Sequence, residues 1–305
     1  MLTSGDAEEA NRVTRVMLAI DNHAIAAVRR AAGPNGGDVF MSEVKTTSPA
    51  GKFCWYEWMG DDAAAAADFY AHIVGWTAKN TAGTGERPYI VLSAGAYGVA
   101  GMITISPEAK AKSAPPCWAG YIWVEDVDSA AAKLVAAGGA VQRAPADIPG
   151  IGRFAVVTDP QGAYFRLFRD AGGNPPPPPA PDTPGLVGWR ELHAGDDGAA
   201  FAFYSGLFGW TKRRGMEMGA AGVYQLFGFA GGDHDAGGVM NRMPEMPAPM
   251  WLYYFNVPAI DAAAERVKAK GGKIVNGPME VPGGQWIVHG LDLEGALFAL
   301  VAPKR

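Results

Sequence analysis

The chain has 305 residues, of which 49% are apolar and 19% are charged, and its net charge is −5. This composition is ordinary for a globular protein, so the length predicts two domains and excludes wholesale disorder. The small negative charge provides no basic field for a phosphate backbone, so we expect no nucleic-acid partner.

Neither the cysteines nor the apolar segments indicate a secreted or membrane protein. Cys54 and Cys117 are the only cysteines, which excludes a disulfide scaffold and a zinc ribbon. No apolar run reaches the ~18 residues of a membrane helix. Asp6, Glu8 and Glu9 stand where a signal peptide would be positively charged. We therefore expect a cytoplasmic protein with no membrane partner.

Residues 1–51 are expected to form an extension rather than a domain. Residues 7–31 carry apolar side chains close to helical spacing and predict one helix, and the glycines and prolines of 33–52 predict a loop. Met41, followed by Ser-Glu-Val-Lys, is a plausible translation start of its own. The extension is therefore either a poorly packed segment or the product of a translation start placed too early.

Two long segments, 52–170 and 186–305, repeat one another. Trp55-Tyr56-Glu57 recurs 134 positions later as Trp189-Arg190-Glu191, and Asp159 recurs 133 positions later as Asp292. A nearly constant shift over more than a hundred residues indicates duplication of a whole domain. Between the two domains, residues 171–185 include five consecutive prolines, which predict a semi-rigid spacer or a docking site for a proline-reading partner.

Each domain is expected to contain the order strand, helix and three strands twice. In the first domain we expect strands at 53–58, 76–80, 88–93, 97–105, 118–124, 140–143, 153–158 and 163–168, and helices at 63–73 and 128–137. In the second domain we expect strands at 187–193, 210–213, 222–229, 237–240, 251–257, 273–276, 285–289 and 296–301, and helices at 197–208 and 261–270. The pattern predicts an α+β fold.

Two motifs resemble those of the vicinal oxygen chelate superfamily, which includes glyoxalase I, bleomycin-resistance proteins and extradiol dioxygenases. The first has Glu57, Asp62, Phe69-Tyr70 and Gly75-Trp76 in the spacing Glu-x4-Asp-x6-Phe-Tyr-x4-Gly-Trp, and the second is the turn Asp159-Pro-Gln-Gly-Ala-x-Phe165. The resemblance covers both domains. It implies tandem domains, each a pair of βαβββ units that curl a mixed sheet into an incomplete barrel. We expect the domains to form an intramolecular pseudo-dimer within a monomer or a homodimer.

The resemblance also implies where metal ligands would stand. These positions fall on Trp55 and Trp189 (first strands), Ala119 and Leu252 (fifth strands), Arg166 and Ala299 (last strands), and near Gly101-Met102 and Gly238-Val239 (fourth strands). None of these residues is the His, Asp, Glu or Cys that a divalent ion needs. Shifting the alignment by two residues would bring in Glu57 and Glu191 but no histidine in the first domain. We therefore predict no cofactor and disfavour a divalent metal.

Strand alternation directs a set of aromatic and charged side chains toward an expected cavity in each domain. The candidate ligand-binding residues are Trp55, Glu57, Tyr121, Trp123 and Arg166 in the first domain, and Trp189, Glu191, His193 and Tyr254 in the second. Buried glutamates need partners, so Glu57 and Glu191 are either fold-supporting acceptors or anchors for a ligand. His193, which has no counterpart in the first domain, is either structural or part of the site.

Arg166 has two interpretations. It either points to solvent at a strand edge, or shares a cavity with Glu191 and His193 of the other domain, where it would pair with Glu191 or with a ligand carboxylate. In the second case Arg166→Met should weaken the binding of an acidic ligand and leave the fold intact. Because the two cavities differ in residues, we expect one dominant binding site per chain.

The sequence therefore predicts a glyoxalase/bleomycin-resistance-like protein that binds a small organic molecule in an aromatic-lined cavity, without metal. The alternative is a metal-dependent lyase, isomerase or oxygenase that acts on an α-oxo or vicinal-oxygen substrate. In that case a metal would polarise the carbonyl and a glutamate would move a proton. A third alternative is an assembly module without a ligand.

Overall fold

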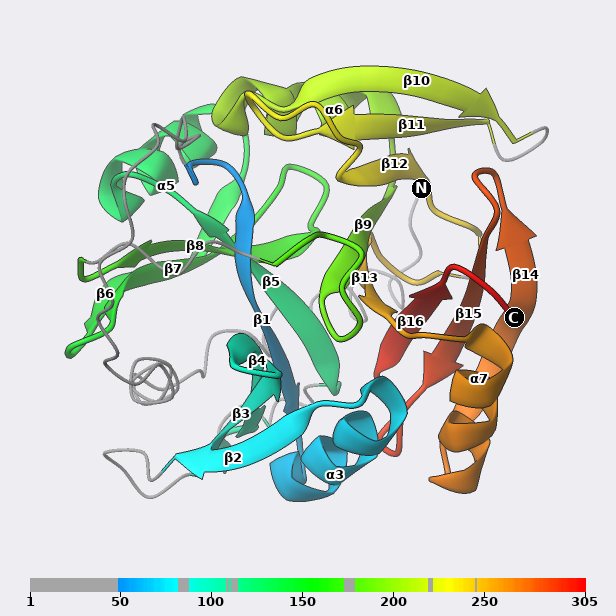
Figure 1. The fold of residues 1–305 in the computed structure, drawn as a ribbon. Helices are drawn as coiled ribbons and strands as arrows, with labels where there is room; N and C mark the ends of the chain where they lie inside the picture. The colour runs from blue at the N-terminus through cyan, green and yellow to red at the C-terminus, as the bar shows by residue number, and fades with distance from the viewer. Residues whose placement is uncertain are drawn as a thin grey trace, which may run out of the picture.

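The computed structural model describes residues 49–81, 88–107, 110, 115–172, 179–218, 222–244 and 246–305. The expected helix at 7–31 and the loop after it as far as residue 48 lie outside these residues, as do residues 173–178 of the proline-rich spacer. The described part forms two domains, each built on one mixed eight-stranded sheet (Figure 1). No helix in this part is long and apolar enough to cross a lipid bilayer.

The first sheet combines two βαβββ units. The first unit contains β1 (Phe53–Gly60), α3 (Ala63–Val74), β2 (Thr77–Thr81), β3 (Tyr89–Ala94) and β4 (Tyr97–Thr104). The second contains β5 (Cys117–Trp123), α5 (Val127–Ala136), β6 (Ala140–Ile148), β7 (Gly152–Thr158) and β8 (Tyr164–Asp170). The strand order β2-β3-β4-β1-β5-β8-β7-β6 places the two first strands together at the centre and leaves the barrel open.

The second sheet repeats this plan. Its first unit contains β9 (Val187–Ala194), α6 (Asp197–Phe208), β10 (Thr211–Glu217), β11 (Val223–Gly228) and β12 (Gly237–Asn241). Its second unit contains β13 (Met250–Asn256), α7 (Ile260–Ala269), β14 (Lys273–Val281), β15 (Gln285–Leu291) and β16 (Leu297–Ala302). The order β10-β11-β12-β9-β13-β16-β15-β14 matches the first sheet strand for strand. The predicted α+β fold of tandem domains is confirmed.

The helix ends follow from residues that cap them. Asp62 accepts hydrogen bonds from the amides of Ala64 and Ala65 at the start of α3, and Gly75 ends that helix in the left-handed region with φ of 90°. Asp196 and Gly209 do the same for α6. The repeated caps explain why both helices begin and end at matching positions.

Two strands are more than twice as long as the sequence predicts. We expected strands at 140–143 and 273–276, but β6 and β14 continue to Ile148 and Val281. Both are edge strands, and the pairing register shifts across Pro145, between Arg143 and Ala146, and across Pro278, between Asn276 and Met279. A proline lacks the N–H that a central strand must donate, but an edge strand with a bulge tolerates it.

One continuous hydrophobic core joins the two domains through the faces of the sheets that carry the helices. Trp118 of the first domain and Phe255 of the second have ring centres 4.9 Å apart. Helix α3 contacts α7, and α5 contacts α6 (Figure 1). The opposite face of each sheet carries hydrophobic clusters drawn from one domain only.

Hydrogen bonds cross the domain interface in both directions. Asp292 accepts from Trp58 Nε1 at 2.7 Å and from Tyr70 Oη at 3.0 Å, both in the other domain. In the reverse direction, Asp159 accepts from Tyr204 Oη at 3.2 Å. These aspartates are the first residues of the two matching turns, so the interface has the pseudo-twofold symmetry expected of a duplicated chain.

Candidate functional site

The first domain buries an ion pair on the sheet face away from the interface. Glu57 on β1 and Arg166 on β8 are both fully buried, with Oε2 and Nη1 2.5 Å apart. The same Nη1 donates to Tyr121 Oη at 2.7 Å, and the guanidinium carbon lies 4.6 Å from the centre of the Tyr121 ring. Nη2 lies 2.9 Å from Met59 Sδ. A planar cation is therefore held by a carboxylate and a tyrosine.

The other carboxylate oxygen of Glu57 accepts from Tyr89 Oη at 3.2 Å, and Trp55 Nε1 donates to Tyr89 Oη at 3.0 Å. Burial and the nearby Glu57 raise the pKa of Tyr89 well above its ordinary value, so its hydroxyl stays protonated. Gly101 pairs with Glu57 across the strands, and a Cβ there would lie 1.8 Å from Tyr89 Oη. Glycine is needed at this position for space.

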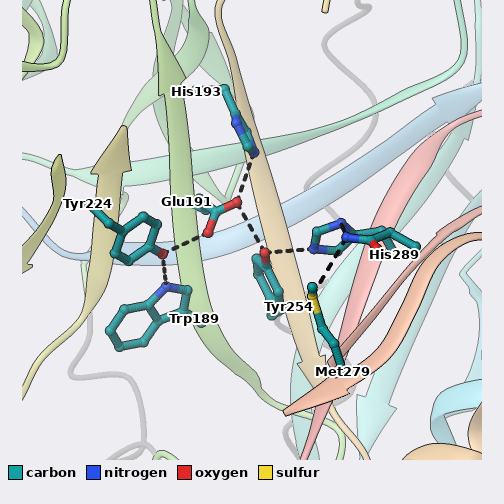
Figure 2. Close-up of polar contacts among 8 residues, drawn as sticks. Trp189, Glu191, His193, Tyr224, Tyr254, Met279 and His289 are labelled. Carbon is teal, nitrogen blue, oxygen red and sulfur yellow. Dashed lines mark hydrogen bonds and ion pairs between the residues drawn. The ribbon is translucent and has the colours of Figure 1, made fainter. Parts of the chain in front are cut away.

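The second domain repeats this frame around Glu191. Tyr224 Oη donates to Glu191 Oε2 at 2.7 Å, and Trp189 Nε1 donates to Tyr224 Oη at 2.7 Å (Figure 2). Gly238 pairs with Glu191, and a Cβ there would lie 2.2 Å from Tyr224 Cζ. The frame shared by the two domains is thus a tryptophan, a glutamate and two tyrosines: Trp55, Glu57, Tyr89 and Tyr121, or Trp189, Glu191, Tyr224 and Tyr254.

Histidines replace the arginine in the second domain. Tyr254 Oη donates to Glu191 Oε1 at 3.1 Å, and His193 Nε2 lies 2.8 Å from the same oxygen. His289 Nε2 lies 2.9 Å from Tyr254 Oη. Because Tyr254 has one proton and donates it to Glu191, His289 is the donor in that contact (Figure 2). Burial lowers the pKa of His289, which favours the neutral ring.

Glu191 is ionised although it is buried. Burial acts to raise its pKa, but His193 and the Tyr224 hydroxyl outweigh burial, and the pKa lies below its ordinary value. Its hydrogen-bond and ion-pair contacts within the described residues come from His193, Tyr224 and Tyr254, none of which is a permanent cation. Ala299 stands in the strand register where the first domain has Arg166.

The sheet faces that carry the two sites also differ in how well apolar side chains cover them. In the first domain one cluster covers the ion pair, and it includes Ile151, Phe154, Tyr164 and Phe168. Smaller residues occupy the matching positions of the second domain, shifted by 133: Gly284, Ile287, Leu297 and Val301. There the apolar residues form two separate clusters that meet only through Trp189. Trp189 and His289 are partly exposed, whereas Trp55 and Val156 at the matching positions are buried, so the second site is less completely covered than the first.

The comparison with protein families agrees with this duplicated architecture. The family model of the Glyoxalase/Bleomycin resistance protein/Dioxygenase superfamily matches residues 53–167 and again residues 187–300. The chain belongs to this superfamily. The resemblance seen in the two sequence motifs is therefore confirmed, and each match coincides with one eight-stranded sheet.

Relatives of similar length are found in actinobacteria. CFP32 of Mycobacterium bovis, provisionally named a glyoxylase, is 33% identical over 82% of this chain and 94% of that protein. The anthracycline biosynthesis protein DnrV of Streptomyces peucetius is 31% identical over 81% of this chain and 91% of that protein. The Mn(II)-bound glyoxalase of Novosphingobium aromaticivorans shares the fold, with a TM-score of 0.59, 16% identity and coverage of 83% and 82%.

The expected cross-domain site is wrong for this superfamily member. We expected Arg166 to meet Glu191 and His193 or to reach solvent, but it is fully buried against Glu57 of its own domain. The reason is that the domains pack through their helix-bearing faces. The opposite face, which carries the site residues, is therefore formed by a single sheet in each domain. The prediction that Arg166→Met weakens the binding of an acidic ligand therefore no longer holds.

The structure brings together most of the candidate residues, in two groups. One group contains Trp55, Glu57, Tyr121 and Arg166, and the other contains Trp189, Glu191, His193 and Tyr254. Trp123 joins neither group: it donates to Asp170 at 2.9 Å and stacks with Arg169. Sequence analysis missed Tyr89, Tyr224 and His289. The repeat contained a signal for the tyrosines, because Tyr89 is the first residue of β3 and Tyr224 is the second residue of the matching strand β11.

The residues of this superfamily member do not fit a divalent metal ion. The last-strand position implied for a ligand is held by the Arg166 guanidinium in the first domain and by Ala299 in the second. Across the described residues, no group of three or more His, Cys, Asp or Glu side chains converges as a metal site. Glu191 and His193 supply two donors, fewer than a stable protein site uses.

Proposed function

We propose that the second domain binds a small organic molecule at the domain-two cluster, which comprises Trp189, Glu191, His193, Tyr224, Tyr254 and His289. The observation that carries this proposal is the contrast between two copies of one frame. The first copy holds its own arginine and is sealed by bulky side chains. The second copy keeps the ionised glutamate, lacks the arginine and has a partly exposed tryptophan at its edge.

Physical chemistry supports a ligand at the second copy. A carboxylate removed from water needs compensation, and two tyrosine hydroxyls with a titratable histidine provide less of it than a permanent cation does. A partly exposed indole beside polar groups is typical of sites that take an organic ligand. The names of the relatives, which refer to a glyoxylase and to anthracycline biosynthesis, agree with a small organic ligand or substrate.

The metal-dependent alternative has less support. A metal-dependent lyase, isomerase or oxygenase needs converging ligands for its ion, and the two donors Glu191 and His193 do not provide them. Metal-free binding accounts for the same carboxylate and histidine.

The test is a thermal-shift screen of the full chain with a library of cationic, anionic and neutral organic fragments. We expect stabilisation to reach about 2.7 kcal/mol at a 100-fold excess of ligand over Kd. Glu191→Gln should abolish the shifts, and Glu280→Gln, an exposed position on β14 of the same domain, should preserve them. Isothermal titration with any confirmed fragment should give one site per chain. Two equal sites, or shifts that survive Glu191→Gln, would contradict the proposal.

A further inference from the structure

The first domain shows which chemical group the shared frame holds. The Arg166 guanidinium is a planar cation whose Nη1 contacts the Glu57 carboxylate at 2.5 Å and the Tyr121 hydroxyl at 2.7 Å. Its carbon lies over the Tyr121 ring. Charge, planarity and several N–H donors therefore match a frame made of one carboxylate and aromatic rings.

The second domain keeps the frame but has lost the cation. Tyr254 and Ala299 pair in the register in which Tyr121 and Arg166 pair in the first domain. Trp189, Tyr224 and Glu191 keep the hydrogen bonds of their counterparts. The frame can therefore take from outside the group that the first domain supplies from its own chain.

His193 provides an independent sign of a missing partner. Its side chain is 9% exposed, and neither ring nitrogen has a well-aligned hydrogen-bond partner within the described residues. The 2.8 Å contact of Nε2 with Glu191 is an ion-pair contact whose angle is poor for a hydrogen bond. A buried nitrogen in this condition calls for a partner. With a proton on Nε2, which faces Glu191, Nδ1 can accept one N–H of a ligand while the carboxylate accepts another.

We propose that the ligand of the domain-two cluster carries a planar nitrogen cation, an amidinium or guanidinium group, which binds the Glu191 carboxylate beside His193. This inference rests on the proposed function and specifies its ligand class. An anion would face the Glu191 carboxylate, and a neutral amide would leave that charge uncompensated.

Three probes of nearly equal shape test the charge: benzamidine (a cation), benzamide (neutral) and benzoate (an anion). Isothermal titration of the full chain at neutral pH should give benzamidine an affinity at least tenfold higher than either of the others, about 1.4 kcal/mol. Glu191→Gln should lower benzamidine affinity at least tenfold, and Glu280→Gln should leave it unchanged.

A transplant variant tests the equivalence of the two frames. His193→Met, His289→Val and Ala299→Arg together place in the second domain the residues found at the matching positions of the first: Met59, Val156 and Arg166. The new arginine should occupy the frame, so the folded triple variant should lose benzamidine binding. Circular dichroism and the melting temperature report whether it folds, and the single Glu191→Gln variant tests the inference if it does not.

The outcomes separate the inference from the proposed function. Equal or tighter binding of benzamide or benzoate, or no benzamidine binding at about 10 mM, overturns the planar-cation inference. The proposed function fails on a different result, namely library fragments whose binding is indifferent to Glu191→Gln. Anionic or neutral fragments that depend on Glu191 would support the function and overturn the inference.

Discussion

Arg166 and Ala299 occupy the same position in the last strand of two homologous sheets, each paired in parallel with a tyrosine of the neighbouring strand. In the first domain the arginine reaches Glu57 and the ion pair is sealed. In the second domain the equivalent Glu191 meets His193 instead. The two domains therefore hold one glutamate that pairs with an arginine of its own domain and one that has no arginine partner in the part of the chain that the structure describes.

Arg166→Met should destabilise the protein strongly. It removes the cation that compensates Glu57 and leaves a fully buried carboxylate, so we expect a loss of about 3–5 kcal/mol in the free energy of unfolding. Urea denaturation measures the loss. The double variant Glu57→Gln/Arg166→Met removes both charges and should recover most of it. A single variant within about 1 kcal/mol of the wild type would contradict a structural role for the pair.

The two interface aspartates should respond differently to the loss of charge. Asp292→Asn points an amide toward Trp58 Nε1, which can only donate, so we expect a cost of about 1–3 kcal/mol. In Asp159→Asn the amide oxygen can keep the hydrogen bonds from the backbone amides of the turn, and the NH2 group then faces the Tyr204 hydroxyl, which can reverse its role, so the cost should be less than about 1 kcal/mol. Urea midpoints of the two variants test the order, and equal costs would be evidence against it.

The glycines opposite the glutamates are expected to be intolerant of alanine. Gly101→Ala would push into Tyr89 and Gly238→Ala into Tyr224, each at a cost of about 1–3 kcal/mol. The first should cost more, because Tyr89 is fully buried. Gly206→Ala on α6 is the matched control: no heavy atom lies within 4 Å of its added Cβ, so it should be neutral or stabilising. The prediction fails if all three variants melt alike.

Acid should weaken the domain-two cluster through Glu191. Burial acts to raise its pKa, but His193 and Tyr224 outweigh burial and hold the pKa below its ordinary value in the folded state. The contribution of Glu191 to stability is therefore present above the unfolded pKa and is lost as pH falls through the folded pKa. The difference in unfolding free energy between wild type and Glu191→Gln should stay constant near neutrality and decline below about pH 5. A difference that grows in acid would show that folding raises the pKa of Glu191 instead of lowering it.

The fold could be predicted from the sequence because its signals are local and occur twice. The capping aspartates, the glycines that end the helices and the matching turns each specify a short segment, and the repeat confirms each one. The lengths of β6 and β14 could not be predicted, because Pro145 and Pro278 exclude only a central strand. Whether a strand lies at an edge depends on the whole sheet.

Most residues of the candidate site were predictable, but Tyr224, His289 and the pairings were not. Strand alternation correctly grouped Trp189, Glu191 and His193 on one face. It could not show which sheet that face meets, and so it could not assign Arg166 to Glu57. That assignment depends on how the domains pack, which is decided by apolar side chains such as Trp118 and Phe255 far along the chain from the pair.

The continuous core between the domains has a consequence for synthesis on the ribosome. While only the first domain has emerged, Trp58 and Tyr70 lack the acceptor that Asp292 provides, because Asp292 belongs to the second domain, which is made later. The helix-bearing face of the first sheet stays uncovered for the same reason. Stalled nascent chains that end near residue 185 should therefore be cleaved by protease faster than the full-length chain. The first domain is translated early but matures late, when the second domain arrives to cover it.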